Sequence, residues 1–244
     1  MKILGVIPAR YASTRFPAKA LADIGGKPMV QRVYEQALKA KKLTKVIVAT
    51  DHAKIVEAVQ GFEGNVCLTD ENHQSGTDRC NEVLTKEVDE FDYVINIQGD
   101  EPFIDPSQID LLAGLLDGKT ELGTLVKKIE DTHELFDPNA VKCVFNNNNE
   151  ALYFSRSTVP FLRNKPKEQW LEHQDFYKHI GIYAYRADIL KIIAHLPPSS
   201  LEHAESLEQL RWLENGYKIR IAETHIPSFG VDTPDDLMRL KDFY

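Results

Sequence analysis

The sequence predicts an α/β domain built on a doubly wound, mostly parallel sheet, with a smaller α+β insertion. Short apolar runs alternate with segments of helical periodicity through the first half of the chain, which is the pattern of βαβ units. The run 93–97 is apolar at nearly every position, as expected of a central parallel strand covered on both faces. After Pro106 the alternation gives way to a hairpin pattern, and this change locates the insertion.

The first half is expected to alternate strands with helices. A helix begins at Pro28, because apolar residues recur at helical spacing after it and proline suits the first helical position. Each helix separates two strands, so consecutive strands are expected to run parallel. The strands are expected at 2–7, 45–49, 65–68 and 93–97, and the remaining helices at 53–60 and 77–88.

The second half begins with an expected hairpin. Its strands, 141–145 and 151–154, flank an asparagine run that tolerates left-handed turn conformations. The later strand 178–186 has a period of two, which places His179 and Tyr183 on the same face. The remaining elements are expected to be a helix at 202–215, a strand at 217–223 and a helix from Pro234.

Length and charge limit the class of protein. The 244 residues suit one large α/β domain, 1–130 with 178–244, interrupted by the insertion 131–177. The formal net charge is -8, and no basic stripe is present, so a nucleic-acid partner is not expected. Lysine and arginine gather near the predicted loops instead, which favours a small anionic ligand.

Cysteines and apolar segments indicate the compartment. The three cysteines, Cys67, Cys80 and Cys143, lack the spacing of a metal or redox site, which favours a reducing environment. The apolar run at the N-terminus is too short for a secretory signal, and no later run is long enough to span a bilayer. A cytoplasmic protein with no membrane partner is therefore expected.

The loop from Pro8 to Lys19 follows the first strand and carries the cations Arg10, Arg15 and Lys19. Open α/β sheets bind ligands at the carboxyl ends of their strands, where guanidinium and ammonium groups can bind phosphate. On spacing alone, a solvated basic loop is an equal alternative. A dinucleotide fold is not indicated, because no G-x-G-x-x-G follows the strand. The run 25–28, Gly-Gly-Lys-Pro, is interpreted as a turn.

Two carboxylates lie where they can hold a metal. Asp100 follows the apolar strand 93–97, and there it can bind Mg²⁺ together with nucleotide phosphates. In the later run Gly230-Val231-Asp232-Thr233-Pro234-Asp235-Asp236, Thr233 and Asp236 resemble a capping box, which leaves Asp232 available as a second ligand. Taken singly, each aspartate is equally well explained as a turn residue.

Seven segments occur in an order that points to one family. They are Pro8 to Arg15 with Pro17 and Lys19, Ser75-Gly76-Thr77-Asp78-Arg79, Asn96 to Pro102, Ala151 to Arg156, His179 to Tyr183, Leu207 to Arg211 and Gly230 to Pro234. Together they resemble the cytidylyltransferases of 3-deoxy-manno-octulosonate (Kdo), and the match runs from Ile7 to Asp236. One departure is Ala20, where members of the family usually have proline.

The resemblance implies transfer of CMP from CTP to the anomeric hydroxyl of Kdo, with release of pyrophosphate, for bacterial lipopolysaccharide biosynthesis. It implies Mg²⁺ held by Asp100 and Asp232, and a homodimer formed through the smaller region. The catalytic cations would be Arg10, Arg15 and Lys19. The nucleotide would be bound by Pro8, Ala9, Arg10, Lys19, Ser75, Gly76, Arg79 and Gln98, and the sugar by Gln98, Arg156, His179, Tyr183, Glu208 and Gln209.

Two alternatives remain at this point. A related acidic sugar, such as 8-amino-Kdo or sialic acid, could replace Kdo, because a single substituent is read by the shape of the pocket. A nucleotide-sugar-binding module without catalysis is the alternative from another class. The joint presence of Arg10, Lys19, Asp100 and Asp232 argues against that module, since binding alone tolerates their loss.

Overall fold

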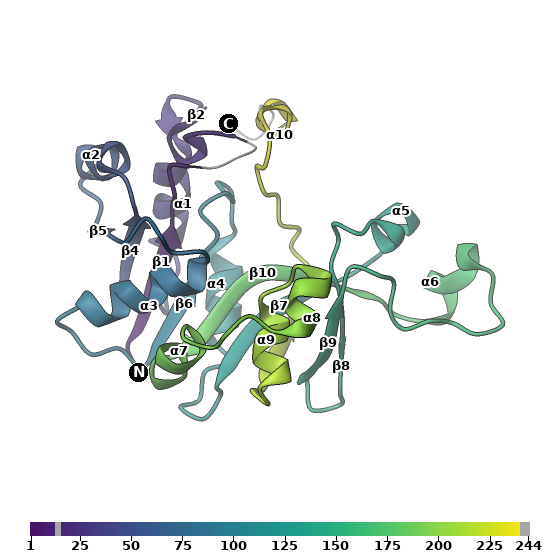
Figure 1. The fold of residues 1–244 in the computed structure, drawn as a ribbon. Helices are drawn as coiled ribbons and strands as arrows, with labels where there is room; N and C mark the ends of the chain where they lie inside the picture. Colours follow the sequence, from purple (N-terminus) through teal and green to yellow (C-terminus); the bar gives the residue numbers. More distant parts are fainter. Residues whose placement is uncertain (13–15, 240–244) are drawn as a thin grey trace.

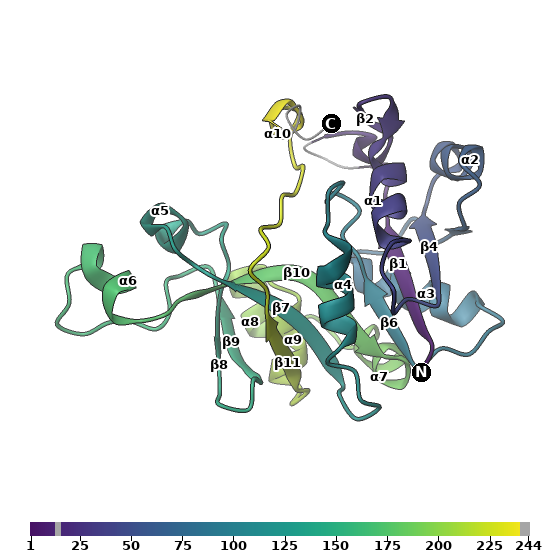
Figure 2. The same ribbon diagram turned by 180° about the vertical axis from the view of Figure 1, so that it is seen from behind.

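The structure, a computed structural model, describes residues 1–12 and 16–239. Within these residues one nine-stranded sheet forms the centre of the molecule (Figures 1 and 2). Along the seven-strand path of this sheet four of the six pairings are parallel, so the predicted fold class is confirmed. The strand order is β11 (Ile219–Glu223), β7 (Leu122–Lys128), β10 (Tyr177–Arg186), β6 (Tyr93–Asn96), β1 (Ile3–Pro8), β4 (Lys45–Thr50) and β5 (Val66–Leu68).

The strand β10 runs against its neighbours in the middle of the sheet. It pairs antiparallel with β6 on one side and with β7 on the other. A bulge between Ile180 and Tyr183 interrupts its pairing with β7, and the Thr124 hydroxyl donates to the carbonyls of Ile180 and Ile182 there. His179 and Tyr183 lie on the same side, with ring centroids 5.2 Å apart, so the predicted shared face is confirmed.

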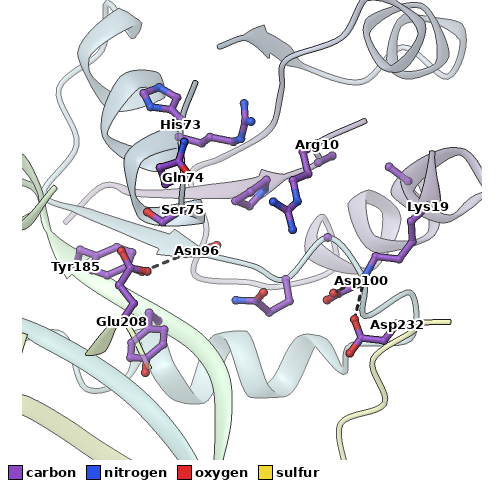
Figure 3. Close-up of a pocket in the computed structure, with 18 residues that line it drawn as sticks. Arg10, Lys19, His73, Gln74, Ser75, Asn96, Asp100, Tyr185, Glu208 and Asp232 are labelled. Carbon is purple, nitrogen blue, oxygen red and sulfur yellow. Dashed lines mark hydrogen bonds and ion pairs between the residues drawn. The ribbon is translucent and has the colours of Figure 1, made fainter. Parts of the chain in front are cut away.

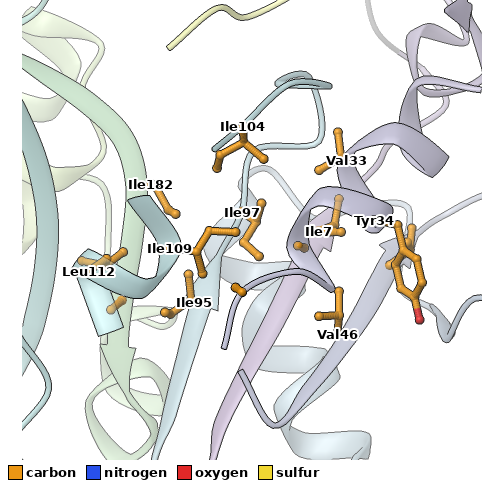
Figure 4. Close-up of a cluster of buried hydrophobic side chains, with 14 of the residues drawn as sticks. Ile7, Val33, Tyr34, Val46, Ile95, Ile97, Ile104, Ile109, Leu112 and Ile182 are labelled. Atoms are coloured by element: carbon orange, nitrogen blue, oxygen red, sulfur yellow. The ribbon is translucent and has the colours of Figure 1, made fainter. Parts of the chain in front are cut away.

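Helices cover both faces of the sheet. Residues of α1 (Met29–Ala37), α2 (Ala53–Gly61) and α4 (Pro106–Ala113) bury an apolar cluster against one face, part of which is drawn in Figure 4. On the other face a second cluster joins α3 (Gly76–Lys86), α7 (Ala187–Ile193) and α9 (Gln209–Glu214). Along β1, Ile3 and Ile7 belong to the first cluster and Leu4 and Val6 to the second, as strand alternation requires.

The turn expected at 25–28 is present between β2 (Asp23–Ile24) and β3 (Lys27–Pro28). Gly25 and Gly26 have φ angles of 58° and 81°, a left-handed conformation that favours glycine. The short helix η1 (Lys19–Leu21) precedes this hairpin and begins at the predicted cation Lys19.

The region 131–177 consists of a hairpin and an extended arm. The hairpin strands β8 (Lys142–Phe145) and β9 (Ala151–Ser155) join the main sheet through the start of β10. Beyond them the chain extends away from the sheet as the arm 157–176, visible in both ribbon views. The arm contains η2 (Lys167–Gln169) and α6 (Trp170–His173), and Trp170 and Phe176 pack with Leu135 of α5 (Thr132–Phe136) in a separate cluster.

The single helix expected at 202–215 is wrong. The structure has two helices, α8 (Ser200–Glu205) and α9, separated at Ser206, which has a left-handed φ of 52°. The break buries Leu207 in the second core cluster and turns Glu208 toward the interior. Glu202 of α8 pairs with Arg211 of α9 at 2.6 Å, which joins the two helices across the break.

The last helix, α10 (Pro234–Arg239), begins at the proline that predicts it. The hydroxyl of Thr233 accepts from the Asp236 amide at 3.3 Å, and the Asp236 carboxylate accepts from the Thr233 amide at 2.9 Å. The expected capping box is therefore confirmed. Across the described ranges, every helix is too short or too polar to cross a bilayer.

Candidate active site

A cleft of about 410 Å³ lies where β1 and β6 end, beside the middle of β10 (Figure 3). Most of the residues singled out in the sequence line it, although they come from segments far apart in the chain. Those residues are Pro8, Ala9, Arg10, Lys19, Ser75, Gly76, Arg79, Gln98, Asp100, Tyr183, Glu208 and Asp232. Arg156, His179 and Gln209 do not line it, and Arg15 lies outside the described residues.

The loop after β1 is closed at its base. The Ala9 amide donates to the Ala49 carbonyl at 2.8 Å, which extends the pairing with β4 by one residue. The Ala18 amide donates to the Tyr11 carbonyl at 3.0 Å, so the two ends of the loop meet. This closure places Arg10 and Lys19 at the same edge of the cleft, as Figure 3 shows.

Lys19 lies between the two aspartates. Its Nζ is 2.8 Å from Asp100 Oδ2 and 3.3 Å from Asp232 Oδ1, and its side chain is mostly buried. The Val231 amide donates to the Asp100 carbonyl at 2.9 Å, which joins the chain before α10 to the loop after β6. The two aspartates singled out in the sequence therefore lie beside the same ammonium group, Asp100 from the loop after β6 and Asp232 from the loop before α10.

The donor set fits Mg²⁺. Magnesium is commonly held by one or two carboxylates with substrate phosphates and water as further ligands. Asp100 and Asp232 provide two carboxylates that already share one cation, the Lys19 ammonium. In the part of the chain that the structure describes, no cluster of three or more potential metal ligands occurs, so an all-protein cage is not formed here.

Position 99 has room only for a glycine, because the loop after β6 passes close to the end of β1. A Cβ atom at this position would lie 2.3 Å from the Pro8 carbonyl oxygen, which is backbone and cannot rotate away. The close approach brings Asp100 beside the loop that carries Arg10 and Lys19. The glycine therefore determines the width of the cleft beside Asp100 and the loop after β1.

We expect Gly99→Ala to lower turnover at least about tenfold, because a shift of about 1 Å at a reacting centre is enough for such a loss. The clash should also lower the unfolding free energy by about 1–3 kcal/mol. Initial rates and urea unfolding measure the two effects. Gly61→Ala is the matched control, since nothing lies within 4 Å of the added Cβ. Equal rates for the two variants would contradict the assignment.

The N-terminus of α3 borders the cleft. Ser75 accepts from the Asp78 amide at 3.2 Å, and Asp78 accepts from the Ser75 amide at 3.1 Å, which forms a capping box. A Cβ on Gly76 would come within 3.1 Å of Asn96 Nδ2, so the helix start packs closely on β6. The first turn of α3 thus presents backbone amides beside the cleft, where they suit a nucleotide.

The guanidinium of Arg79 is bound by the protein itself. It donates to Asp51 Oδ2 at 2.7 Å, to Thr69 Oγ1 at 2.7 Å and to the Asp70 carbonyl at 3.1 Å. Only 3% of Arg79 is exposed. Its orientation at the cleft is therefore set by partners on neighbouring loops.

The opposite side of the cleft is a network of buried polar groups. The Thr77 hydroxyl donates to Glu208 Oε2 at 3.0 Å and lies 3.3 Å from the Tyr185 hydroxyl, which also accepts from Asn96 Nδ2 at 3.3 Å. Burial raises the pKa of Glu208, opposed by its hydrogen bonds to Ser75 and Thr77. Among the described residues, Asn96 Oδ1 and the Tyr183 hydroxyl are buried without a hydrogen-bond partner. Unpaired polar atoms of this kind are available for hydrogen bonds to a polar ligand.

Several cleft residues are not among the sequence predictions. The sequence contains a feature that could have identified Asn96, since it is the polar residue within an apolar strand. Tyr185 could have been identified in the same way, because it shares the face of Tyr183. His73 and Gln74 precede the recognised segment at Ser75 and had no signal of their own. Ala20 and Gly99 line the cleft through small size, which composition does not reveal.

Three predicted sugar residues, His179, Arg156 and Gln209, are held by other parts of the protein outside the cleft lining. His179 is 3.0 Å from the Thr124 hydroxyl and packs edge-on against Phe154. Arg156 donates through Nε to the Glu205 carbonyl at 2.7 Å, and Gln209 is 5% exposed. Of the three, His179 contacts the cleft residue Tyr183, with ring centroids 5.2 Å apart, and Gln209 follows Glu208 in the chain.

Burial lowers the pKa of His179 from 6.5 to about 3, so the ring is neutral in the folded protein at neutral pH. The unfolded chain takes up the proton first as the pH falls. The contribution to stability is therefore complete above pH 6.5 and is lost between pH 6.5 and pH 3, by at most about 1.4 kcal/mol per pH unit. We expect urea unfolding at pH 7, 6 and 5 to show this slope. The same slope in His179→Gln would contradict the assignment.

Comparison with known proteins gives a consistent result. Residues 4–219 match the family model described as cytidylyltransferase. A 3-deoxy-manno-octulosonate cytidylyltransferase of Parabacteroides distasonis is 54% identical, with coverage of 100% of this chain and 98% of the relative. The protein of the same name from Cytophaga hutchinsonii is 55% identical, with coverage of 98% and 96%.

Solved structures show the same likeness. A CMP:2-keto-3-deoxy-manno-octonic acid synthetase complexed with CTP superposes with a TM-score of 0.92, at 44% identity and coverage of 100% of this chain and 98% of that one. A 4-diphosphocytidyl-2C-methyl-D-erythritol synthase from Anaerococcus prevotii superposes with a TM-score of 0.64 at 11% identity, with coverage of 99% and 97%, and shares the fold.

Proposed function

The chain belongs to the family of 3-deoxy-manno-octulosonate cytidylyltransferases, and from this premise we infer that it transfers CMP from CTP to Kdo. The products are CMP-Kdo and pyrophosphate. The observation that carries this function is the full-length match to Kdo enzymes together with the superposition on a synthetase that binds CTP. Other acidic sugars and a non-catalytic module are not favoured by these relatives.

The reaction joins the anomeric oxygen of Kdo to the α-phosphorus of CTP, and the bond from that phosphorus to the β-phosphate breaks. Such phosphoryl chemistry depends on positioning and on stabilisation of negative charge. We propose that Arg10 and Lys19 bind the phosphates, while the backbone beside Ser75 and Gly76 binds the cytidine. Gln98 lines the same cleft and donates to the Gly181 carbonyl of β10. It is proposed to lie near the α-phosphate of the bound nucleotide.

Asp100 and Asp232 are proposed to hold Mg²⁺, which when bound offsets the negative charge of the triphosphate. Lys19, which now lies between the two carboxylates, is proposed to donate to a phosphate oxygen of CTP. The aspartates then orient this lysine as well as providing metal ligands. Neither role requires a histidine base, and His179 is unsuited to one because of its low pKa.

The sugar is proposed to occupy the side of the cleft next to β10. The Tyr183 hydroxyl and Asn96 Oδ1 are buried there without partners among the described residues, and Glu208 is held by Thr77. These groups provide a donor and acceptors for the hydroxyls of Kdo. His179, Gln209 and Arg156 are proposed to act with them from behind.

We also propose that the protein is a cytoplasmic homodimer that serves lipopolysaccharide biosynthesis. The arm 157–176 supports the dimer, because Phe161 is 75% exposed beside Trp170 on a segment that extends from the sheet. Sedimentation of the wild type as a dimer, and of Phe161→Asp as a monomer, is expected. A monomeric wild type would contradict the proposal.

Pyrophosphate release from CTP, Kdo and Mg²⁺ tests the function directly. We expect turnover with Kdo and much less with sialic acid. Binding of CTP without pyrophosphate release would instead indicate a module without catalysis. Parallel assays with 8-amino-Kdo measure how the pocket discriminates at a single substituent.

A further inference from the structure

Asp51 connects two segments that both line the cleft, the loop after β1 and the helix α3. It follows β4 directly, at the edge of the sheet where β1 also ends. Its Oδ1 accepts from the Tyr11 amide at 3.0 Å, and its Oδ2 accepts from Arg79 Nη2 at 2.7 Å. One carboxylate therefore bonds to the loop after β1 and to helix α3.

The link to the loop is made at the point that controls its shape. The Tyr11 amide donates to the Asp51 carboxylate. The Tyr11 carbonyl accepts from the amide of Ala18, the residue before Lys19, at 3.0 Å. The Tyr11 ring stacks on His52 with centroids 3.8 Å apart and planes 13° apart. The residue between the two cations Arg10 and Lys19 is thus fixed from its backbone and its ring.

The link to α3 is equally well defined. The other branch of the Arg79 fork binds Thr69 and the Asp70 carbonyl, and the Thr69 amide in turn donates to the Thr50 carbonyl at 2.7 Å. The side chains of Arg79 and Asp51 are 4% and 11% exposed, so water does not compete freely for their charges. A planar guanidinium bound on two sides has a single orientation.

We propose that Asp51 is a positioning residue that sets the distance and angle between the phosphate-binding loop and the nucleoside-binding segment at Arg79. This inference rests on the proposed function, since it takes Arg10 and Lys19 as phosphate ligands and α3 as the nucleoside side. A nucleotide bridges the two segments, so its affinity depends on their being fixed relative to each other. A ligand that touches one segment alone does not gain from the link.

The test compares CTP with its two parts on Asp51→Asn. This change keeps an oxygen for the Tyr11 amide but removes the charge that binds Arg79. We expect CTP to bind about tenfold more weakly by calorimetry, while pyrophosphate and cytidine, followed by NMR titration, weaken less than about threefold. The KM for CTP should rise more than kcat falls. If Asp51 acted only on stability, the melting temperature would fall and the three affinities would keep their ratio.

Glu87→Gln is the matched control, because Glu87 pairs with Lys45 at 2.6 Å at the other end of the same strand. It should leave all three affinities unchanged. Asp51→Glu keeps the charge while displacing the carboxylate by one methylene group, so it provides a second test if Asp51→Asn does not fold. Unchanged CTP affinity in a folded Asp51 variant overturns the inference. A wild type that binds CTP but releases no pyrophosphate with Kdo contradicts the proposed function instead.

Discussion

Asp100→Asn is expected to lower kcat by about 10³-fold, equivalent to about 4 kcal/mol of transition-state stabilisation. The amide matches the carboxylate in shape, so the effect reports charge. The substitution removes a proposed metal ligand and also the partner at 2.8 Å from the Lys19 ammonium. Both losses affect the end of the cleft that is proposed to bind the phosphates, where the proposed reaction accumulates negative charge.

Pyrophosphate release at saturating CTP and Kdo measures this effect. Asp235→Asn is the control, because Asp235 is an exposed carboxylate in the first turn of α10, three residues after Asp232. It should retain wild-type turnover. Melting temperatures of the two variants separate a change of chemistry from a change of stability. If Asp100→Asn kept about a tenth or more of the wild-type kcat, Asp100 would not have the role assigned to it.

Lys19→Met is expected to lower kcat/KM for CTP by about 10²-fold to 10³-fold, because the charge is lost while the length of the side chain is kept. A second effect has the opposite sign. Without the ammonium, the carboxylates of Asp100 and Asp232 lose the cation they share, so Mn²⁺ should bind the free protein more tightly than it binds the wild type.

Steady-state kinetics measure the first effect, and electron paramagnetic resonance of Mn²⁺ measures the second without any turnover. Lys218→Met serves as the control, since Lys218 is an exposed lysine paired with Glu150. Lower activity combined with unchanged Mn²⁺ affinity would show that Lys19 does not compete with the metal.

Strand order and strand ends explain why much of the site follows from the sequence. Arg10, Lys19 and Asp100 each follow a parallel strand, and such ends meet at one edge of a sheet. Asp232 lies near the other end of the chain. The capping box formed by Thr233 and Asp236 accounts for the neighbouring polar groups, and this leaves Asp232 available as a ligand. These positions could be predicted because strand ends and helix caps are determined by local sequence.

The distance of a side chain from the cleft and the position of a break between two helices could not be predicted from the sequence in the same way. The alternation along β10 predicts which face of the strand His179 lies on. It does not predict the distance of His179 from the cleft, because that distance depends on packing against Tyr183. The turn between α8 and α9 has a serine, Ser206, in the left-handed conformation, so the sequence has no glycine there to predict the turn. Without this turn Glu208 would not reach Thr77. Tertiary packing decides both features.

The position of β10 in the sheet has a consequence for how such enzymes can diverge. The proposed nucleotide residues lie at the ends of the parallel strands β1 and β6, in the loops that follow them and at the start of α3, whereas the proposed sugar residues lie mainly on the antiparallel β10 and at the start of α9. The two sides share the backbone ladder between β6 and β10, and substitutions of side chains on β10 and α9 leave that backbone pairing in place. A lineage can therefore acquire a new acceptor through β10 and α9 while it inherits its nucleotide chemistry unchanged.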